Sequence, residues 1–167
     1  MSKTQSKQCG VLWKPHKYQQ KAVKHLLTRD AAALFLDPGL GKTSIALEAF
    51  VELKTKGEAH KALVVAPMRV CYAVWPQEVK KWSQFSGVRE AVLHGPGKEA
   101  ALQSDADVYV INPEGLDWLL KSTKQRYMAN SRDRRTGDVV AVKRTKVTVD
   151  VKAFAALGFD TLIVDEL

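Results

Sequence analysis

Short apolar runs alternate along this chain with segments in which apolar residues recur every three or four positions. The apolar runs are residues 31–36, 61–67, 90–95, 107–112 and 161–167. The segments with helical spacing are residues 18–27, 43–56, 75–82, 98–104, 113–122 and 151–159. Strands that are apolar along their whole length are typical of a parallel sheet buried on both faces. The alternation therefore predicts an α/β fold, a parallel sheet with helices on both faces.

Residues 121–150 interrupt this alternation. The segment is polar as far as Asp138 and then alternates apolar and polar residues, as an exposed strand does. We predict a basic, β-hairpin-like insertion that turns at Arg144 and Thr145, inside a single domain that covers residues 11–167. Residues 1–10 are polar and are predicted to form a flexible basic tail.

Length and composition narrow the class of protein. The 167 residues suffice for one domain with a core, and 46% hydrophobic residues is ordinary for a globular protein. No apolar run reaches the roughly 18 residues that a membrane span requires, and residues 1–10 lack the apolar stretch of a secretory signal. Cys9 and Cys71 fit no metal-ligand or redox spacing, so we interpret them as free thiols in a reducing cytoplasm.

The formal net charge of +8 is concentrated in two segments. Residues 1–29 contain seven Lys or Arg and no acidic residue, and residues 121–150 contain nine Lys or Arg against three Asp. This distribution favours a polyanionic partner, although a disordered tail and a solvated hairpin would carry the same charges. Within the insertion we predict that Arg132, Arg134 and Arg135 contact nucleic-acid phosphates.

The sequence DPGLGKT, residues 37–43, ends in the Gly-Lys-Thr core of a phosphate-binding loop. Glycine permits backbone angles that turn successive N–H groups toward phosphate oxygens, and the helix that follows offers its free N–H groups to the same anion. Lys42 would lie between the outer phosphates, and the Thr43 hydroxyl would bind Mg²⁺. The predicted nucleotide-binding residues are Pro38, Gly39, Leu40, Gly41, Lys42, Thr43 and Ser44.

This loop departs from the standard pattern at two positions. A small residue is expected five positions before Gly41, where this chain has Leu36. Pro38 has no N–H group to offer to a phosphate. Gly39 must then allow the close approach that the missing first glycine would have allowed. A glycine turn that only joins a strand to a helix is the alternative.

The sequence TLIVDEL, residues 161–167, places two acidic residues at the carboxyl end of an apolar strand. Ligands of open parallel sheets bind at that end of the strands. Asp165 can hold Mg²⁺ through its water shell, and Glu166 can orient and deprotonate an attacking water. We therefore predict Mg²⁺ binding by Thr43 and Asp165 and catalytic roles for Lys42 and Glu166. A pair of solvated carboxylates is the alternative.

Several motifs, in their order along the chain, resemble the first RecA-like domain of superfamily-two helicases. They are DPGLGKT, LVVAP, VWPQEVKKW, VLHG, VYVINPEGL and LIVDEL, and they are most similar to Swi/Snf-type DNA translocases of phages and bacteria. The resemblance runs from Leu12 to Leu167 except for residues 121–150. It implies a RecA-like P-loop NTPase domain, incomplete at its C-terminal end, in the cytoplasm of a bacterial or phage-infected cell.

The resemblance also implies cofactors, partners and further site residues. The cofactors are ATP and Mg²⁺, and the partners are duplex DNA and a second RecA-like domain in cis that supplies an arginine finger. The segment KYQQ implies that Gln19, or alternatively Gln20, reads the adenine edge. Arg69 and Asn112 are implied to touch the nucleic-acid backbone.

The tryptophans and the missing second domain also bear on the interpretation as a helicase-like ATPase domain. Trp13 either flanks the adenine or belongs to the core, and Trp75 and Trp82, seven positions apart, are interpreted as packing residues on one helix face. Without the second domain we expect weak nucleotide binding, slow or no hydrolysis, and an open sheet edge that needs a partner. A non-catalytic nucleic-acid- or partner-binding module, or an RNA helicase domain, remains an alternative, although VDEL in place of DEAD favours DNA.

Overall fold

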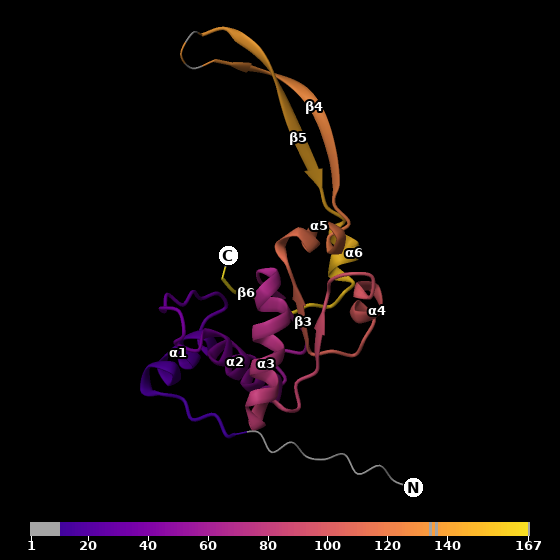
Figure 1. The fold of residues 1–167 in the computed structure, drawn as a ribbon. Helices are drawn as coiled ribbons and strands as arrows, with labels where there is room; N and C mark the ends of the chain where they lie inside the picture. Colours follow the sequence, from indigo (N-terminus) through magenta and orange to yellow (C-terminus); the bar gives the residue numbers. More distant parts are fainter. Residues whose placement is uncertain (1–10, 134, 136, 167) are drawn as a thin grey trace. The chain divides into compact units, whose positions relative to one another are not determined.

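A computed structural model describes residues 11–133, 135 and 137–166 (Figure 1). The chain divides into two compact units, Met1–Pro113 with Phe159–Leu167, and Glu114–Gly158. The predicted tail at residues 1–10 lies outside the described residues, and the predicted insertion at residues 121–150 lies inside the second unit. In the described part of the chain, no helix combines the length and apolarity that a membrane span requires.

The first unit contains a four-stranded parallel sheet with the strand order β2-β3-β1-β6. Its strands are β1 (Ala62–Val65), β2 (Glu90–Val92), β3 (Val108–Ile111) and β6 (Thr161–Val164). Every residue of β1 and β3, the two central strands, is buried. The predicted α/β fold with a parallel sheet is therefore confirmed.

Helices of the first unit cover the sheet. They are α1 (Lys17–Leu27), α2 (Lys42–Lys56), α3 (Trp75–Lys81) and α4 (Lys98–Leu102), and a π-helical turn, Val70–Val74, precedes α3. Ile45 and Phe50 of α2 are buried in one cluster with Val64 of β1. The connection from β1 to β2 contains α3, and the connection from β2 to β3 contains α4. These two connections run in opposite directions along the sheet. Because parallel connections are right-handed, α3 and α4 lie on opposite sides of β3 (Figure 1).

The predicted strand at residues 31–36 is wrong: this segment has no regular secondary structure. Leu34 and Leu36 pack against the core, but Phe35 between them is 96% exposed. A strand needs a neighbour for its N–H and C=O groups. Within the described residues, β6 is an edge strand that pairs only with β1, and residues 31–36 form no ladder with its open edge.

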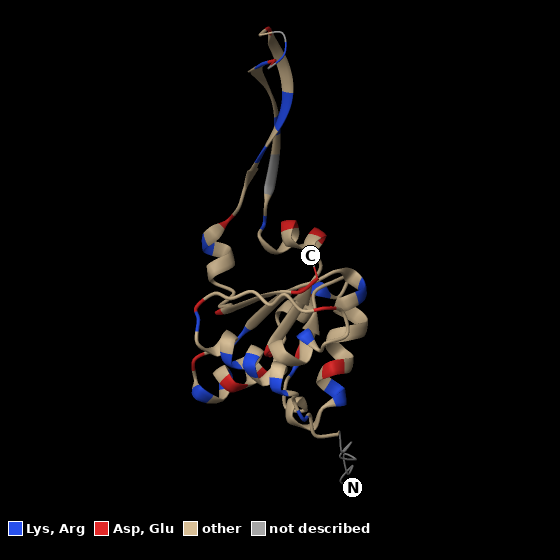
Figure 2. Cartoon of the chain, turned by 90° about the vertical axis from the view of Figure 1, so that its left-hand side faces the viewer, with Lys and Arg blue, Asp and Glu red and all other residues tan. Residues whose placement is uncertain are grey.

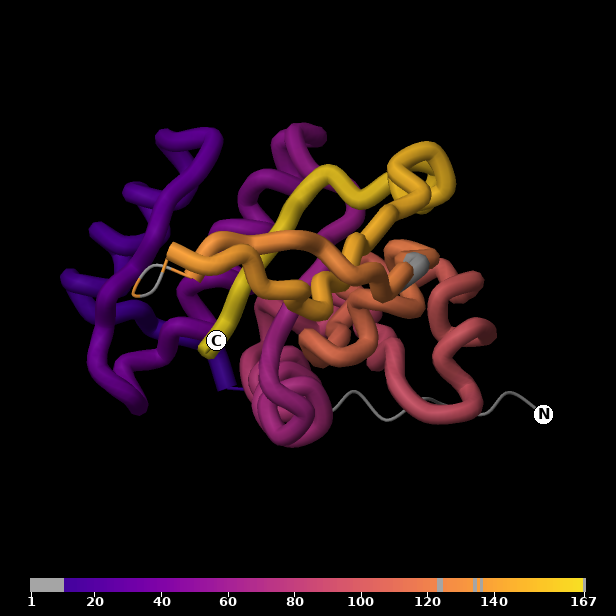
Figure 3. Tube along the Cα trace, turned by 90° about the horizontal axis from the view of Figure 1, so that it is seen from above, coloured from indigo at the N-terminus to yellow at the C-terminus, as the bar shows by residue number. Residues whose placement is uncertain are grey.

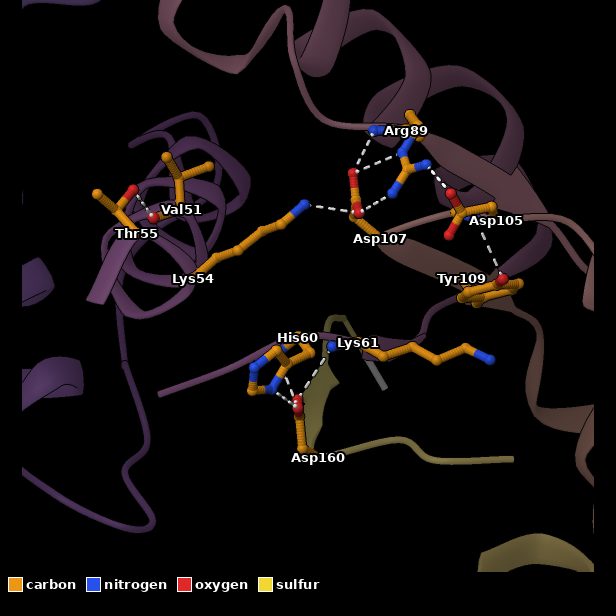
Figure 4. Close-up of polar contacts among 11 residues, drawn as sticks. Val51, Lys54, Thr55, His60, Lys61, Arg89, Asp105, Asp107, Tyr109 and Asp160 are labelled. Carbon is orange, nitrogen blue, oxygen red and sulfur yellow. Dashed lines mark hydrogen bonds and ion pairs between the residues drawn. The ribbon is translucent and has the colours of Figure 1, made fainter. Parts of the chain in front are cut away.

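Buried Asp107 joins α2 to the amino ends of β2 and β3 (Figure 4). Its carboxylate lies 2.6 Å from Lys54 Nζ at the end of α2, and Arg89 before β2 donates to both carboxylate oxygens at 3.2 and 2.7 Å. Burial opposes ionisation, but the hydrogen bonds from Arg89 and Lys54 outweigh it and hold the pKa of Asp107 well below its usual range. This cluster holds α2, whose first turn carries the candidate site, against the sheet.

The second unit contains an antiparallel ribbon of β4 (Thr123–Arg132) and β5 (Val139–Thr148), with α5 (Leu116–Leu119) before it and α6 (Val151–Ala155) after it. The predicted turn at Arg144 and Thr145 is wrong, because both lie inside β5. The ribbon turns between Asp133, whose N–H donates to the Asp138 carbonyl at 2.8 Å, and Gly137, whose φ is +82°. Aspartate and glycine favour turns, whereas Arg-Thr has no turn preference.

Candidate nucleotide-binding site

The predicted phosphate loop has two glycines in the left-handed region of backbone conformation. Gly39 has φ +83° and Gly41, the residue that caps the start of α2, has φ +76°. A Cβ atom at Gly41 would lie 2.7 Å from the Gln19 side-chain nitrogen, so another residue here would be strained at this φ and would displace the Gln19 amide. Pro38 and Gly39 are exposed and Leu40 is half-buried.

Lys42 lies at the first position of α2, and its side chain folds back over the loop. Its Nζ donates to the carbonyl of Leu36 at 3.1 Å and to that of Asp37 at 3.3 Å. The ammonium group is therefore held at the loop itself, where the sequence predicted that it would meet phosphate oxygens.

Gln19 of α1 contacts this loop directly. Its side chain is 6% exposed, its Nε2 donates to the Leu40 carbonyl at 3.1 Å, and its Oε1 accepts the His16 N–H at 2.9 Å. The amide thus ties the loop to the start of α1, and its predicted contact with adenine stays a prediction. The alternative residue, Gln20, is exposed and donates to the Pro15 carbonyl at 3.1 Å.

Thr43 and Asp165 meet although they are 122 positions apart in the sequence. The Thr43 hydroxyl donates to Asp165 Oδ2 at 3.3 Å, and the Trp75 indole nitrogen donates to the same oxygen at 3.0 Å. Asp165 is 8% exposed. Figure 3 shows the end of the chain between the segments that carry Thr43 and Trp75. The fold therefore brings together the two residues that were predicted to bind Mg²⁺.

These residues suit Mg²⁺, which prefers hard oxygen ligands and usually binds through one or two protein groups together with waters and substrate phosphates. A hydroxyl and a carboxylate that already touch fit this requirement. Among the described residues no group of three or more His, Cys, Asp or Glu could hold a metal by itself. Glu166, beside Asp165, is exposed and has φ +55°, an uncommon conformation for a residue other than glycine.

Glu78 of α3 is a supporting residue that the sequence reasoning missed. Its Oε2 accepts the Ser44 hydroxyl at 2.6 Å and the Trp82 indole N–H at 2.7 Å. Burial opposes ionisation, but these hydrogen bonds and the Lys81 charge outweigh it, so the pKa of Glu78 lies below its usual value. A signal was present, because residues 75, 78 and 82 follow helical spacing and so share one face.

The remaining predicted residues belong to other segments of the chain. Arg69, before the π-helical turn, is exposed, whereas Asn112, after β3, is 5% exposed, and their contacts with nucleic acid stay predictions. Arg132 and Arg135 are exposed in the second unit, and Arg134 lies outside the described residues.

Trp13 and Trp75 are core residues. Trp13 is 5% exposed and packs against Phe85 with ring centroids 5.9 Å apart, so the core interpretation of Trp13 is confirmed. Trp75 is 1% exposed and packs in the same cluster as Trp13, with Trp82 partly buried against it. The packing interpretation of Trp75 and Trp82 is also confirmed, but it omitted the hydrogen bonds that both indoles donate.

Comparison with known proteins gives three results. A family model described as the SNF2-related domain matches residues 18–166. Protein p41 of Acyrthosiphon pisum secondary endosymbiont phage 1 is 34% identical over 110 residues, which are 64% of this chain and 24% of p41. The SWI2/SNF2 ATPase core of Sulfolobus solfataricus, solved in complex with dsDNA, superposes with a TM-score of 0.56 and is 24% identical in sequence. The match covers 67% of this chain and 23% of the Sulfolobus chain. This chain therefore spans about a quarter of the length of either relative.

Proposed function

Because this chain belongs to the SNF2-related domain family, we propose that it is the ATP-binding half of a DNA-dependent ATPase that hydrolyses Mg-ATP to move along DNA. The observation that carries the proposal is the 3.3 Å contact between Thr43, in the first turn of α2, and Asp165, directly after β6. A hydroxyl beside a phosphate loop and a carboxylate on a neighbouring strand end are the groups that hold a metal–nucleotide in this kind of site.

Each residue at the loop would have a separate task. Lys42 would exchange its bonds to the Leu36 and Asp37 carbonyls for bonds to phosphate oxygens. Thr43 and Asp165 would hold Mg²⁺, and Glu166 would accept a proton from the attacking water. The bound Mg-ATP supplies the phosphoryl group that this water attacks. The Sulfolobus relative was solved with dsDNA, and this supports duplex DNA as the polymer of the proposal.

We also propose that the β4–β5 ribbon binds nucleic-acid phosphates. Figure 2 shows Lys and Arg along the ribbon, and in the described part of the chain none of these five forms an ion pair: Arg126, Arg132, Lys143, Arg144 and Lys146. Because alternate residues point to opposite faces, the register places the first three on one face and the last two on the other. A two-stranded ribbon fits the major groove of DNA, and cations on both faces suit a groove with phosphates on both walls.

Nucleotide binding tests the proposed function most directly. A fluorescent ATP analogue is titrated into the wild-type chain and into Lys42→Ala, both with Mg²⁺. We expect the substitution to weaken binding at least about tenfold, which corresponds to roughly 1.4 kcal/mol for removing a charge-assisted hydrogen bond to phosphate. Lys56→Ala is the matched control, since Lys56 belongs to the same helix and its described ion pair is with Glu52, 3.6 Å away.

The outcome separates the two functional classes. Binding of the ATP analogue that depends on Lys42 but not on Lys56 supports the ATPase. Binding that is unchanged by the Lys42→Ala substitution supports a non-catalytic module with a nucleotide-binding fold. Competition between duplex DNA and duplex RNA of one sequence then separates a DNA translocase from an RNA helicase domain.

A further inference from the structure

Trp75 is placed to act on the candidate metal site as well as on the core. It is the first residue of α3, it is 1% exposed, and its indole N–H donates to Asp165 Oδ2 at 3.0 Å across 90 positions of sequence. A buried carboxylate is costly unless donors satisfy it. The hydrogen bond to an ionised oxygen is of the stronger, charge-assisted kind, so it constrains the carboxylate that it meets.

Both donors to Asp165 use the same oxygen. Oδ2 accepts from Trp75 and from the Thr43 hydroxyl, whereas no hydrogen bond to Oδ1 is found within the described residues. Two donors on one oxygen restrict rotation of the carboxylate and thereby set the direction in which Oδ1 points. This leaves Oδ1 available to a metal ion or to a water bound to the metal.

The two donors differ in what else they can offer. A hydroxyl can donate its proton to Asp165 and still present an oxygen lone pair to Mg²⁺, so Thr43 can serve the metal directly. An indole N–H is a donor only, so Trp75 can act on the metal only through Asp165. Its burial in the core holds the donor in place, as a rigid support for a metal ligand requires.

We propose that Trp75 is a positioning residue whose indole N–H orients the Asp165 carboxylate for Mg²⁺, an inference that rests on the proposed function. Its loss should weaken Mg²⁺ binding without weakening metal-free nucleotide binding. Substitutions of residues that orient metal ligands typically lower metal affinity by about 10–100-fold.

The experiment compares Trp75→Phe, which keeps an aromatic ring but loses the N–H, with Trp118→Phe. Trp118 is the control because it belongs to the other unit, so the same Trp-to-Phe change is made away from the candidate site. Each protein is first titrated with a fluorescent ATP analogue in EDTA, and the complex is then titrated with Mg²⁺. Circular dichroism melting verifies that both variants are folded at the working temperature.

We expect Trp75→Phe to need at least about tenfold more Mg²⁺ than the wild type, with unchanged affinity in EDTA, and Trp118→Phe to follow the wild type. Coincident Mg²⁺ curves for Trp75→Phe and the wild type would overturn the inference alone, provided that binding still depends on Lys42. If Mg²⁺ does not change binding of the ATP analogue to the wild type, the inference is overturned. If the Lys42→Ala substitution also leaves binding of the analogue unchanged, the proposed function is overturned as well.

A second measurement uses the wild type and covers the case in which Trp75→Phe does not fold. In the ¹⁵N-labelled nucleotide complex, the Trp75 indole resonance should shift when Mg²⁺ is added, because its acceptor becomes part of the metal site. The Trp118 indole, in the other unit, provides the reference. A Trp75 resonance that stays in place while Mg²⁺ binds would overturn the inference.

Discussion

Gly41 is the residue whose type matters most to the loop conformation. Its φ of +76° is unfavourable for any side chain, and a Cβ there would lie 2.7 Å from Gln19 Nε2. Gln19 in turn donates to the Leu40 carbonyl, so the glycine permits a contact that holds the loop. Backbone freedom at one position and a buried amide at another thus act together.

For Gly41→Ala we predict a lower free energy of unfolding, by about 1–2 kcal/mol, because alanine is strained at positive φ. We also predict at least about tenfold weaker binding of a fluorescent ATP analogue, because the new methyl group displaces Gln19 from Leu40. Gly57→Ala is the control: it has φ +74° at the other end of α2, with no atom within 4 Å of the added Cβ. It should lose similar stability and keep its affinity, and an equal loss of affinity in both variants would contradict the prediction.

At the scale of elements, α2 is held at both ends by charged or polar side chains from other segments. Its first turn meets Asp165 and Glu78, and its last turn meets Asp107 through Lys54. The Asp107 carboxylate also accepts two hydrogen bonds from the Arg89 side chain, whose guanidinium pairs with exposed Asp105 as well. The position of the phosphate loop therefore depends on contacts far from the loop in sequence.

Asp107→Asn should lower the free energy of unfolding by about 2–4 kcal/mol at pH 7, because Arg89 and Lys54 lose a buried charged partner. The pKa of Asp107 in the folded state lies below its ordinary value near about 3.9, so its stabilisation is present above about pH 4 and is lost as the pH falls toward the folded-state pKa. Urea titrations followed by tryptophan fluorescence should show the gap between wild type and variant narrowing from about pH 5 to about pH 3.

Asp105→Asn is the control for this prediction. Asp105 pairs with the same guanidinium, but its side chain is 90% exposed, and exposed pairs contribute about 1 kcal/mol or less. A pH-independent gap for Asp107→Asn, or an equal effect of Asp105→Asn, would show that the buried charge is not the cause.

Predictions from the sequence succeeded where a local pattern was sufficient. The glycines at residues 39 and 41, the helix from Lys42 and its end at Gly57 follow from backbone preferences of a few residues. Prediction failed at residues 31–36, where an apolar run needed a neighbouring strand, and at the ribbon turn, where turn residues were overlooked in a polar segment. The Glu78 contacts were missed because spacing identifies a helix face but not what that face meets.

At the scale of the whole molecule, charge and fold are divided between two units. The sheet and the candidate nucleotide site belong to the first, whereas the ribbon with its unpaired described cations belongs to the second. Two-stranded ribbons are marginally stable alone, so phosphate contacts would also stabilise this one. The proposed nucleotide binding and the proposed polyanion binding are therefore separable by mutation.

Replacing Arg132, Arg134 and Arg135 together by Ser should flatten the salt dependence of DNA binding. The slope of log K against log salt should fall by about 0.9 for each phosphate that the variant no longer neutralises, as measured by fluorescence anisotropy over a salt series. The control replaces Lys56, Lys80 and Lys98, which removes the same charge from the first unit and should leave the slope unchanged. An unchanged slope in the arginine variant would contradict phosphate contacts by these three arginines, and nucleotide affinity should stay constant in both.

The sequence by itself determined the α/β class, the glycine loop with its lysine, the acidic pair after an apolar strand and the concentration of charge in residues 121–150. Each follows from the order and spacing of nearby residues, which local backbone and solvation preferences convert directly into structure. Only the tertiary structure decided that Thr43 and Trp75 donate to the same oxygen atom of Asp165, that Gln19 holds the loop, and that residues 31–36 form no strand. These outcomes depend on contacts between distant segments, whose geometry no local pattern encodes.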